Sequence, residues 1–190
     1  MKILKKYQIK IPNNVEVFYN ENKKILLCKH KYRQKILKLK LKLVILEKDK
    51  IVAVSNVPFE NFSNEQKKRI KALQGTTVAQ IKQLLMETET TFYKKLQFVG
   101  IGYRAFGLEN YEENIMLLKL GFSHFLYVSI PKTLKMKALK FTKLFIVGNS
   151  YLTVTQQASC IKRHKKPEPY KGKGILYENE KIKLKEGKKV

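Results

Sequence analysis

The chain has 190 residues, a formal net charge of +25 and 44% hydrophobic residues, which suits one domain or two small ones rather than a disordered basic tail. Because so cationic a body repels itself, the charge indicates a polyanionic partner, with nucleic acid as the first candidate. We expect no membrane partner, since no apolar run approaches the roughly 18 residues of a transmembrane helix.

The first half of the chain begins with strands. Residues 15–19 and 25–28 flank a polar turn at 20–23 and predict a hairpin. Residues 35–43 alternate leucine or isoleucine with lysine, which predicts one half-buried strand with a cationic face. Residues 51–54 predict a further strand.

A helix is expected after these strands. Ser63 and Gln66 have the spacing of a capping box. Gly75 weakens the middle of the helix. The apolar residues that share one face at helical spacing are Ile70, Leu73, Val78, Ile81 and Leu84.

The second half repeats the order of strands and then a helix. Strands are expected near residues 96–105, 115–120, 125–130, 136–141 and 144–147, with a polar turn at 109–114. A turn at Gly148 and Asn149 leads into a second helix, on which Val154, Ala158 and Ile161 share a face.

We therefore predict an α+β fold with two similar small domains, each an antiparallel sheet with one packed helix, plus an extended basic C-terminal tail. The expected boundaries are 1–90 for the N-terminal domain, 91–166 for the C-terminal domain and 167–190 for the tail.

The tail carries the clearest binding signal. Residues 162–166 load the end of the second helix with positive charge, and Pro167 stops that helix. Residues 167–174 have little apolar bulk, so we expect an extended loop that needs a partner to hold it. Lys171 and Lys173 alternate with glycines, which lets backbone amides approach a phosphate between two ammonium groups. A solvated flexible tail is the alternative.

Three blocks of sequence resemble one known family. Residues 167–174 read Pro-Glu-Pro-Tyr-Lys-Gly-Lys-Gly, residues 94–105 read Lys-Lys-Leu-Gln-Phe-Val-Gly-Ile-Gly-Tyr-Arg-Ala, and residues 120–124 read Leu-Gly-Phe-Ser-His. In this order and spacing they are similar to the universal large-subunit ribosomal protein six, the L-six family, in its bacterial and organellar form. The resemblance is strongest from about Gly75 onward, and Leu176 departs from it where bacterial members usually carry a basic residue.

The resemblance implies a structural protein of the large ribosomal subunit that binds large-subunit rRNA near the sarcin-ricin loop and the stalk base, where translation factors dock. The implied partners are that rRNA and neighbouring ribosomal proteins of the stalk base, without a small-molecule substrate or cofactor. Tyr170 and Tyr177 suit stacking on a base or ribose. The implied rRNA contacts are Lys94, Lys95, Tyr103, Arg104, Ser123, His124, Arg163, Lys165, Lys166, Tyr170, Lys171, Gly172, Lys173, Gly174 and Tyr177.

Enzymatic signals are weak. Gly100 and Gly102 lack the spacing of a dinucleotide fingerprint, and residues 171–174 lack the end of a phosphate-binding loop. His124 and His164 have no carboxylate partner or nucleophile nearby in sequence, so contact with RNA suits them better than general base catalysis. We predict no enzyme; an RNA- or DNA-binding protein outside the ribosome is the alternative function.

A metal site is the other alternative. Cys28 with His30, and Cys160 with His164, would supply four zinc ligands if the two halves met, but the spacing matches no common finger. A core position for Cys28 is the simpler interpretation. We therefore predict no metal, and two free thiols in a reducing compartment.

The composition also bears on the source. The chain has 36 lysines and four arginines, a skew typical of adenine- and thymine-rich genomes. Its first residues lack the apolar core of a signal peptide and the arginine- and serine-rich pattern of a transit peptide. We expect a mitochondrial ribosome in the matrix and an organelle-encoded chain; a plastid or the cytoplasm of an AT-rich bacterium is the alternative.

Overall fold

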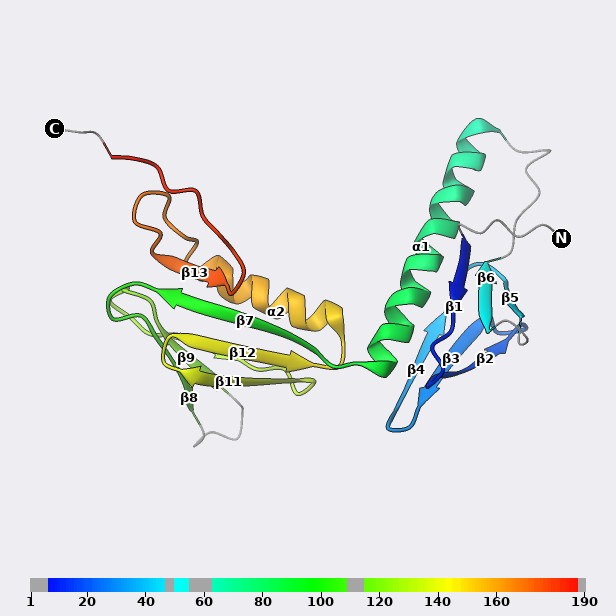
Figure 1. Cartoon of the computed structure of the whole chain (residues 1–190), viewed down its shortest axis with the longest axis horizontal. Helices are drawn as coiled ribbons and strands as arrows, with labels where there is room; N and C mark the ends of the chain where they lie inside the picture. Colours follow the sequence, from blue (N-terminus) through cyan, green and yellow to red (C-terminus); the bar gives the residue numbers. More distant parts are fainter. Residues whose placement is uncertain (1–6, 47–49, 55–62, 109–114, 188–190) are drawn as a thin grey trace. The chain divides into compact units, whose positions relative to one another are not determined.

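The computed structural model describes residues 7–46, 50–54, 63–108 and 115–187. The chain divides into two compact units, residues 1–90 and 91–190 (Figure 1). Each unit has antiparallel strands followed by one helix, which confirms the predicted α+β fold of two similar small domains. The predicted turn at 109–114 lies outside the described residues.

The first unit has two three-stranded sheets with strand orders β1-β6-β5 and β2-β3-β4. Its strands are β1 Gln8–Lys10, β2 Glu16–Asn20, β3 Ile25–His30, β4 Arg33–Lys38, β5 Leu43–Leu46 and β6 Ile51–Val54. The antiparallel pairing of β2 with β3 confirms the predicted hairpin, and β6 confirms the predicted strand at 51–54.

The predicted single strand over 35–43 is wrong. β4 ends at Lys38, and the chain turns before β5 begins at Leu43. The alternation of burial nevertheless continues through the turn, since Leu39 and Leu43 are buried while Lys40 is exposed. The leucine pattern therefore reports which side chains reach the core, but it does not report that the backbone bends.

Helix α1, Asn64–Glu89, completes the first unit. The predicted capping box is confirmed: Ser63 Oγ accepts from the Gln66 amide at 3.3 Å, and Gln66 Oε1 accepts from the Ser63 amide at 3.1 Å. On the predicted apolar face, Ile81 and Leu84 are buried, while the three residues nearer the N-terminus are half-buried. The core of this unit is thus covered mainly by the second half of α1.

The second unit has a three-stranded sheet, β10-β9-β8, and a four-stranded sheet, β11-β12-β7-β13. Helix α2, Tyr151–His164, packs on the four-stranded sheet, and its buried residues Val154, Ala158 and Ile161 are those predicted (Figure 1). The strands are β7 Phe92–Val99, β8 Arg104–Leu108, β9 Ile115–Lys119, β10 Leu126–Ser129, β11 Leu134–Lys140, β12 Lys143–Gly148 and β13 Gly174–Tyr177.

The predicted strand over 96–105 is two strands in different sheets. β7 ends at Val99 and β8 begins at Arg104. Gly100 and Gly102 between them have φ angles of +154° and +75°, and the second lies in the left-handed region that favours glycine. These glycines allow the chain to leave one sheet and enter the other.

Part of the predicted C-terminal tail belongs to the second unit's sheet. β13 pairs antiparallel with β7, with Gly174 opposite Val99 and Tyr177 opposite Leu96. Ile175 is fully buried and joins the hydrophobic core. Residues 174–177 of the predicted tail are therefore a strand of the folded unit, and burial of Ile175 in the core helps to hold it there.

Candidate nucleic-acid interface

The C-terminal end of α2 carries a group of cations. Lys162, Arg163 and His164 form its last turn, where positive charge complements the helix dipole. The helix ends at His164, and the cap residue Lys165 has non-helical backbone angles of φ −145° and ψ 89°. Pro167 comes two residues later and prevents the helix from continuing.

The loop after α2 folds on itself through backbone hydrogen bonds. The Glu168 amide donates to the Lys173 carbonyl at 2.9 Å, and the Gly172 amide donates to the Glu168 carbonyl at 3.0 Å. Gly172 has a φ of +68°, a left-handed conformation that glycine adopts without strain. The Gly172 amide is thus already donated within the loop, which leaves it without the free N–H that the predicted phosphate contact would use.

Two further bonds tie this loop to the rest of the unit. The Ile175 amide donates to the Lys165 carbonyl at 2.9 Å, and the Lys185 amide donates to the Pro169 carbonyl at 2.9 Å. A Cβ on Gly174 would lie 2.5 Å from the Pro167 Cα, so this close approach requires glycine. These hydrogen bonds hold the loop in place from within the chain, so the expectation of an extended loop over residues 167–174 that needs a partner to hold it is wrong.

The turn at 121–125 lies against the end of α2. The Lys165 ammonium is 4.5 Å from the centre of the Phe122 ring, within cation–π range. Phe122 and His124 stack with ring centres 5.6 Å apart and an interplanar angle of 15°. His124 and Ser123 are exposed beside the helix-end cations.

Tyr103 joins this turn to the one between β7 and β8. Its ring would lie 3.0 Å from a Cβ added to either Gly100 or Gly121, so it packs closely against both backbones. Tyr103 is buried within the core of the second unit. The Tyr103 ring therefore packs between the loop that contains Gly100 and the turn that contains Gly121.

Arg104 begins β8 beside the β11–β12 turn. Its guanidinium carbon is 5.8 Å from the centre of the Phe141 ring, and the next residue, Ala105, donates its amide to the Phe141 carbonyl at 2.7 Å. The Phe98 amide near the end of β7 donates to the Thr142 carbonyl at 2.9 Å. Arg104 therefore lies at the same end of the four-stranded sheet as Gly174 and the loop before it.

We call this region the basic end. It brings together many of the predicted contacts at one end of the four-stranded sheet, on loops, on the last turn of α2 and at the start of β8 (Figure 1). Glu168 is the one acid of the loop. The cations of the basic end are Arg104, Arg163, Lys165, Lys166, Lys171 and Lys173, with Ser123, His124, Tyr170 and Gly172 beside them.

The remaining predicted contacts lie elsewhere. Lys94 and Lys95 are in the middle of β7, and Gly174 is buried at the start of β13. Tyr177 is half-buried, with the ammonium groups of Lys162 and Lys94 at 4.6 Å and 5.8 Å from its ring centre. Leu176, where the family pattern expects a basic residue, is buried.

Two carboxylates pair with lysines beside the basic end. Glu178 Oε2 lies 3.1 Å from Lys95 Nζ, and Glu180 Oε2 lies 2.6 Å from Lys162 Nζ. The hydrogen bond from Lys162 lowers the pKa of Glu180 below its ordinary value of 4.5. Within the described part of this unit, both salt bridges use lysines outside the six cations of the basic end.

The candidate metal ligands are not brought together within either unit. Among the residues that the structure describes, no three His, Cys, Asp or Glu side chains form a group that could hold a metal ion. Cys28 is fully buried in the core of the first unit, which confirms the simpler interpretation, and burial raises the pKa of its thiol to about 11. Cys160 is half-buried on α2.

No helix in the described ranges has the length and apolar character needed to cross a membrane.

Comparisons with known proteins identify the family. No protein-family model matches the chain. It is 39% identical over 181 residues to the large ribosomal subunit protein uL6 of Mycoplasmoides gallisepticum, covering 95% of this chain and 92% of that protein. The uL6 of Mycoplasma capricolum is 37% identical, with 95% and 93% covered, and that of Rhodopseudomonas palustris is 42% identical over 138 residues, with 70% and 76% covered.

Similarity over nine-tenths of both chains means common descent, so this basic protein of two α+β units is a member of a ribosomal protein family. It belongs to the uL6 family, in its bacterial type. The resemblance drawn from the three sequence blocks is confirmed.

Proposed function

We propose that the protein is a structural constituent of the large ribosomal subunit and that it binds large-subunit rRNA through the basic end. The observation that carries the proposal is the loop at 168–173, which the chain holds in place while it exposes Lys171 beside the cations that end α2. A loop that is ordered before binding loses less conformational entropy when it meets its partner.

Binding follows from phosphate neutralisation. Each lysine or arginine that contacts a phosphate releases condensed counterions, which favours association and makes it salt-dependent. Lysine serves this role as a point charge, whereas base reading usually needs the fork of arginine. Arg104 and Arg163 are the two arginines of the basic end, so most of its contacts are of the backbone type.

The family membership supports a finer placement. We place the basic end on rRNA near the sarcin-ricin loop and the stalk base, with stalk-base proteins as neighbours and no reaction catalysed by this chain. The bacterial relatives support a ribosome in the cytoplasm of an AT-rich bacterium. The lysine-rich composition supports a bacterial cytoplasm and an AT-rich mitochondrion or plastid equally.

Co-sedimentation tests the proposal. Tagged protein is expressed in source cells, the ribosomal subunits are separated on a sucrose gradient, and RNA crosslinked to the protein is sequenced. The expected result is co-migration with the large subunit at moderate salt, release at high salt, and crosslinks in large-subunit rRNA. Migration at the top of the gradient, with crosslinks spread over unrelated RNAs, would instead indicate a binding protein outside the ribosome.

A double variant tests the loop itself. Lys171→Ala with Lys173→Ala should weaken rRNA binding and reduce the slope of log affinity against log salt by up to about 2. The control is Lys181→Ala with Lys183→Ala, which removes two exposed lysines at the same spacing from the next segment of the chain. Equal losses from both pairs would mean that only total charge matters, and an unchanged slope would contradict the role of the loop.

A further inference from the structure

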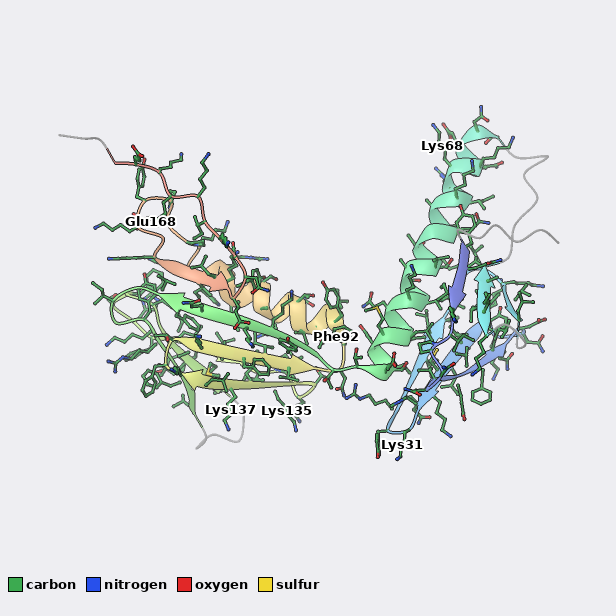
Figure 2. All side chains as sticks on the ribbon, in the orientation of Figure 1. Lys31, Lys68, Phe92, Lys135, Lys137 and Glu168 are labelled. Carbon is green, nitrogen blue, oxygen red and sulfur yellow. The ribbon has the colours of Figure 1, made fainter. Side chains whose placement is uncertain are left out.

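The four-stranded sheet of the second unit has one face that α2 does not cover. Along β7 and β12, Leu96, Leu144 and Ile146 are buried in the core beneath α2. Side chains alternate along a strand, so their neighbours point to the opposite face. We call that opposite side the open face. Figure 2 shows Lys135 and Lys137 of β11 on the side of the sheet away from α2.

The strand register arranges the open face in rows. Tyr93 lies opposite Val147, which lies opposite Lys135. Lys95 lies opposite Phe145, which lies opposite Lys137. Tyr93 and Phe145 are thus diagonal neighbours on adjacent strands, a distance that aromatic side chains can bridge.

The two rings form a stacked pair in the middle of the face. Their centres are 5.3 Å apart with an interplanar angle of 28°, and the Tyr93 side is open because that residue is 59% exposed. The Lys95 ammonium lies 5.8 Å from the Tyr93 ring centre and 6.0 Å from that of Phe145. A flat, exposed ring with a cation beside it is the arrangement on which nucleobases stack.

Lysines surround this pair. Lys135 and Lys137 alternate on β11, which spaces them by about 7 Å along the strand, and Lys143 lies on β12 opposite Gln97. Glu178 comes after β13 and bonds Lys95 at 3.1 Å. A hollow near this pair's lysine is lined in part by Lys95, Gln97 and Lys143. Cations and an amide thus surround the apolar centre.

We propose that the open face binds an unpaired stretch of RNA, with a base stacked on Tyr93 and the adjoining phosphates held by Lys135 and Lys137. A duplex keeps its bases stacked inside, so it could use the lysines but not the ring. An acidic protein segment would use the charges but gains nothing specific from an exposed stacked ring pair. The proposal needs only RNA as partner and is independent of the basic end.

Fluorescence anisotropy on the full-length protein tests the proposal with two probes, a ten-nucleotide single-stranded RNA and a blunt RNA duplex. Tyr93→Ala should raise the Kd for the single strand at least about fivefold, since stacking contributes roughly 1–3 kcal/mol per base. The Kd for the duplex should not change. Tyr93→Phe keeps the ring and should bind like the unmodified chain.

A control variant and a second open-face variant test whether the effect belongs to the open face. Tyr127→Ala removes an exposed tyrosine of β10 in the same unit and should leave single-strand affinity unchanged. Lys135→Ala with Lys137→Ala should reduce the salt slope for the single strand by up to about 1.4. Both lysines are exposed on an edge strand, so their replacement should leave the fold intact. This double variant therefore still tests the proposal if Tyr93→Ala fails to fold.

Three outcomes would overturn the proposal. One is the absence of single-strand binding by the unmodified chain. Another is equal affinity of all the open-face variants and the unmodified chain, which is also what a protein-docking surface would give. The third is a loss confined to Lys171→Ala with Lys173→Ala, which would assign single-strand binding to the basic end and leave the proposed function standing.

Discussion

The two units share their order of elements and differ in the segment that comes after the helix. In the first unit, α1 ends at Glu89, the Thr90 amide caps it by donating to the Met86 carbonyl at 2.9 Å, and β7 of the second unit begins at Phe92. In the second unit, α2 is succeeded by a folded loop and by β13, which returns to the sheet. The second unit therefore has one strand more than the first, and this strand, β13, fixes the end of the basic loop at 168–173 to the sheet.

The helices differ accordingly. α1 buries several polar side chains, among them Glu87, which pairs with Lys35 and accepts from Gln83 Nε2 at 2.8 Å. α2 buries only small or apolar residues and concentrates its charge in the last turn. Among the described residues the second unit also has ion pairs within the fold, Lys95 with Glu178 and Lys162 with Glu180, but neither pair uses a cation of the basic end.

The largest effect on stability is expected from Gly174→Val, which tests whether β13 is anchored in the second unit. Its Cβ would meet backbone atoms of Pro167 at 2.5 Å and 2.7 Å and the Lys166 carbonyl at 2.8 Å. We expect the second unit to lose about 3 kcal/mol or more, from overpacking plus backbone strain, and the first unit to keep its stability. Hydrogen exchange resolved by residue measures both units at once.

Gly107→Val is the control for that substitution. It places the same side chain on β8, where an added Cβ meets no atom of the described residues within 4 Å. If Gly174→Val proves as stable as Gly107→Val, β13 is not anchored as the structure has it.

A medium effect is expected in the first unit from Ser63→Ala. The change removes the side-chain acceptor of the Gln66 amide and should cost about 1 kcal/mol, measured by urea denaturation, through fraying of α1. Ser63→Asp keeps an acceptor at the same position and should restore stability. A loss of protection in α2 on Ser63→Ala would contradict the independence of the two helices.

The smallest effect is expected from Glu180→Gln, which breaks the ion pair with Lys162. The pair is partly exposed, so at neutral pH the loss should stay below about 1 kcal/mol. Because the folded-state pKa of Glu180 is lowered, its contribution is complete above about pH 4.5 and disappears as the pH falls through that lower value.

Thermal unfolding between pH 7 and pH 3 should therefore show a shallower decline for Glu180→Gln than for the unmodified chain. Glu186→Gln, on the same segment, is the control and should match the unmodified curve. Parallel curves for all three proteins would mean that the pair does not help to hold this segment.

Local patterns allowed much of the fold to be predicted. The β2–β3 hairpin, the capping box at Ser63 and the buried face of α2 each depend on residues a few positions apart, and each is confirmed. β13 depends on a pairing with β7 across the length of the unit. The apolar run in β13 consists of Ile175 and Leu176 alone, which is too short to predict a strand within a basic tail. Sequence patterns therefore could not predict β13.

The site divides in the same way. The cations after α2 are contiguous in sequence and were predictable as a group. Tyr103 carries a polar hydroxyl, and only the structure shows that its ring fills the space between Gly100 and Gly121. The Tyr93–Phe145 pair requires the register of two strands that lie far apart along the chain, which no local signal supplies.

The return of β13 also sets an order for folding during synthesis. The first unit has all its core residues once the chain has reached Leu85, and N-terminal domains generally fold first as they emerge. The core of the second unit is completed by Ile175, so β7 stays without this edge partner until almost the whole chain has been made. A nascent chain interrupted before Ile175 would therefore present a finished first unit joined to an open, aggregation-prone second one.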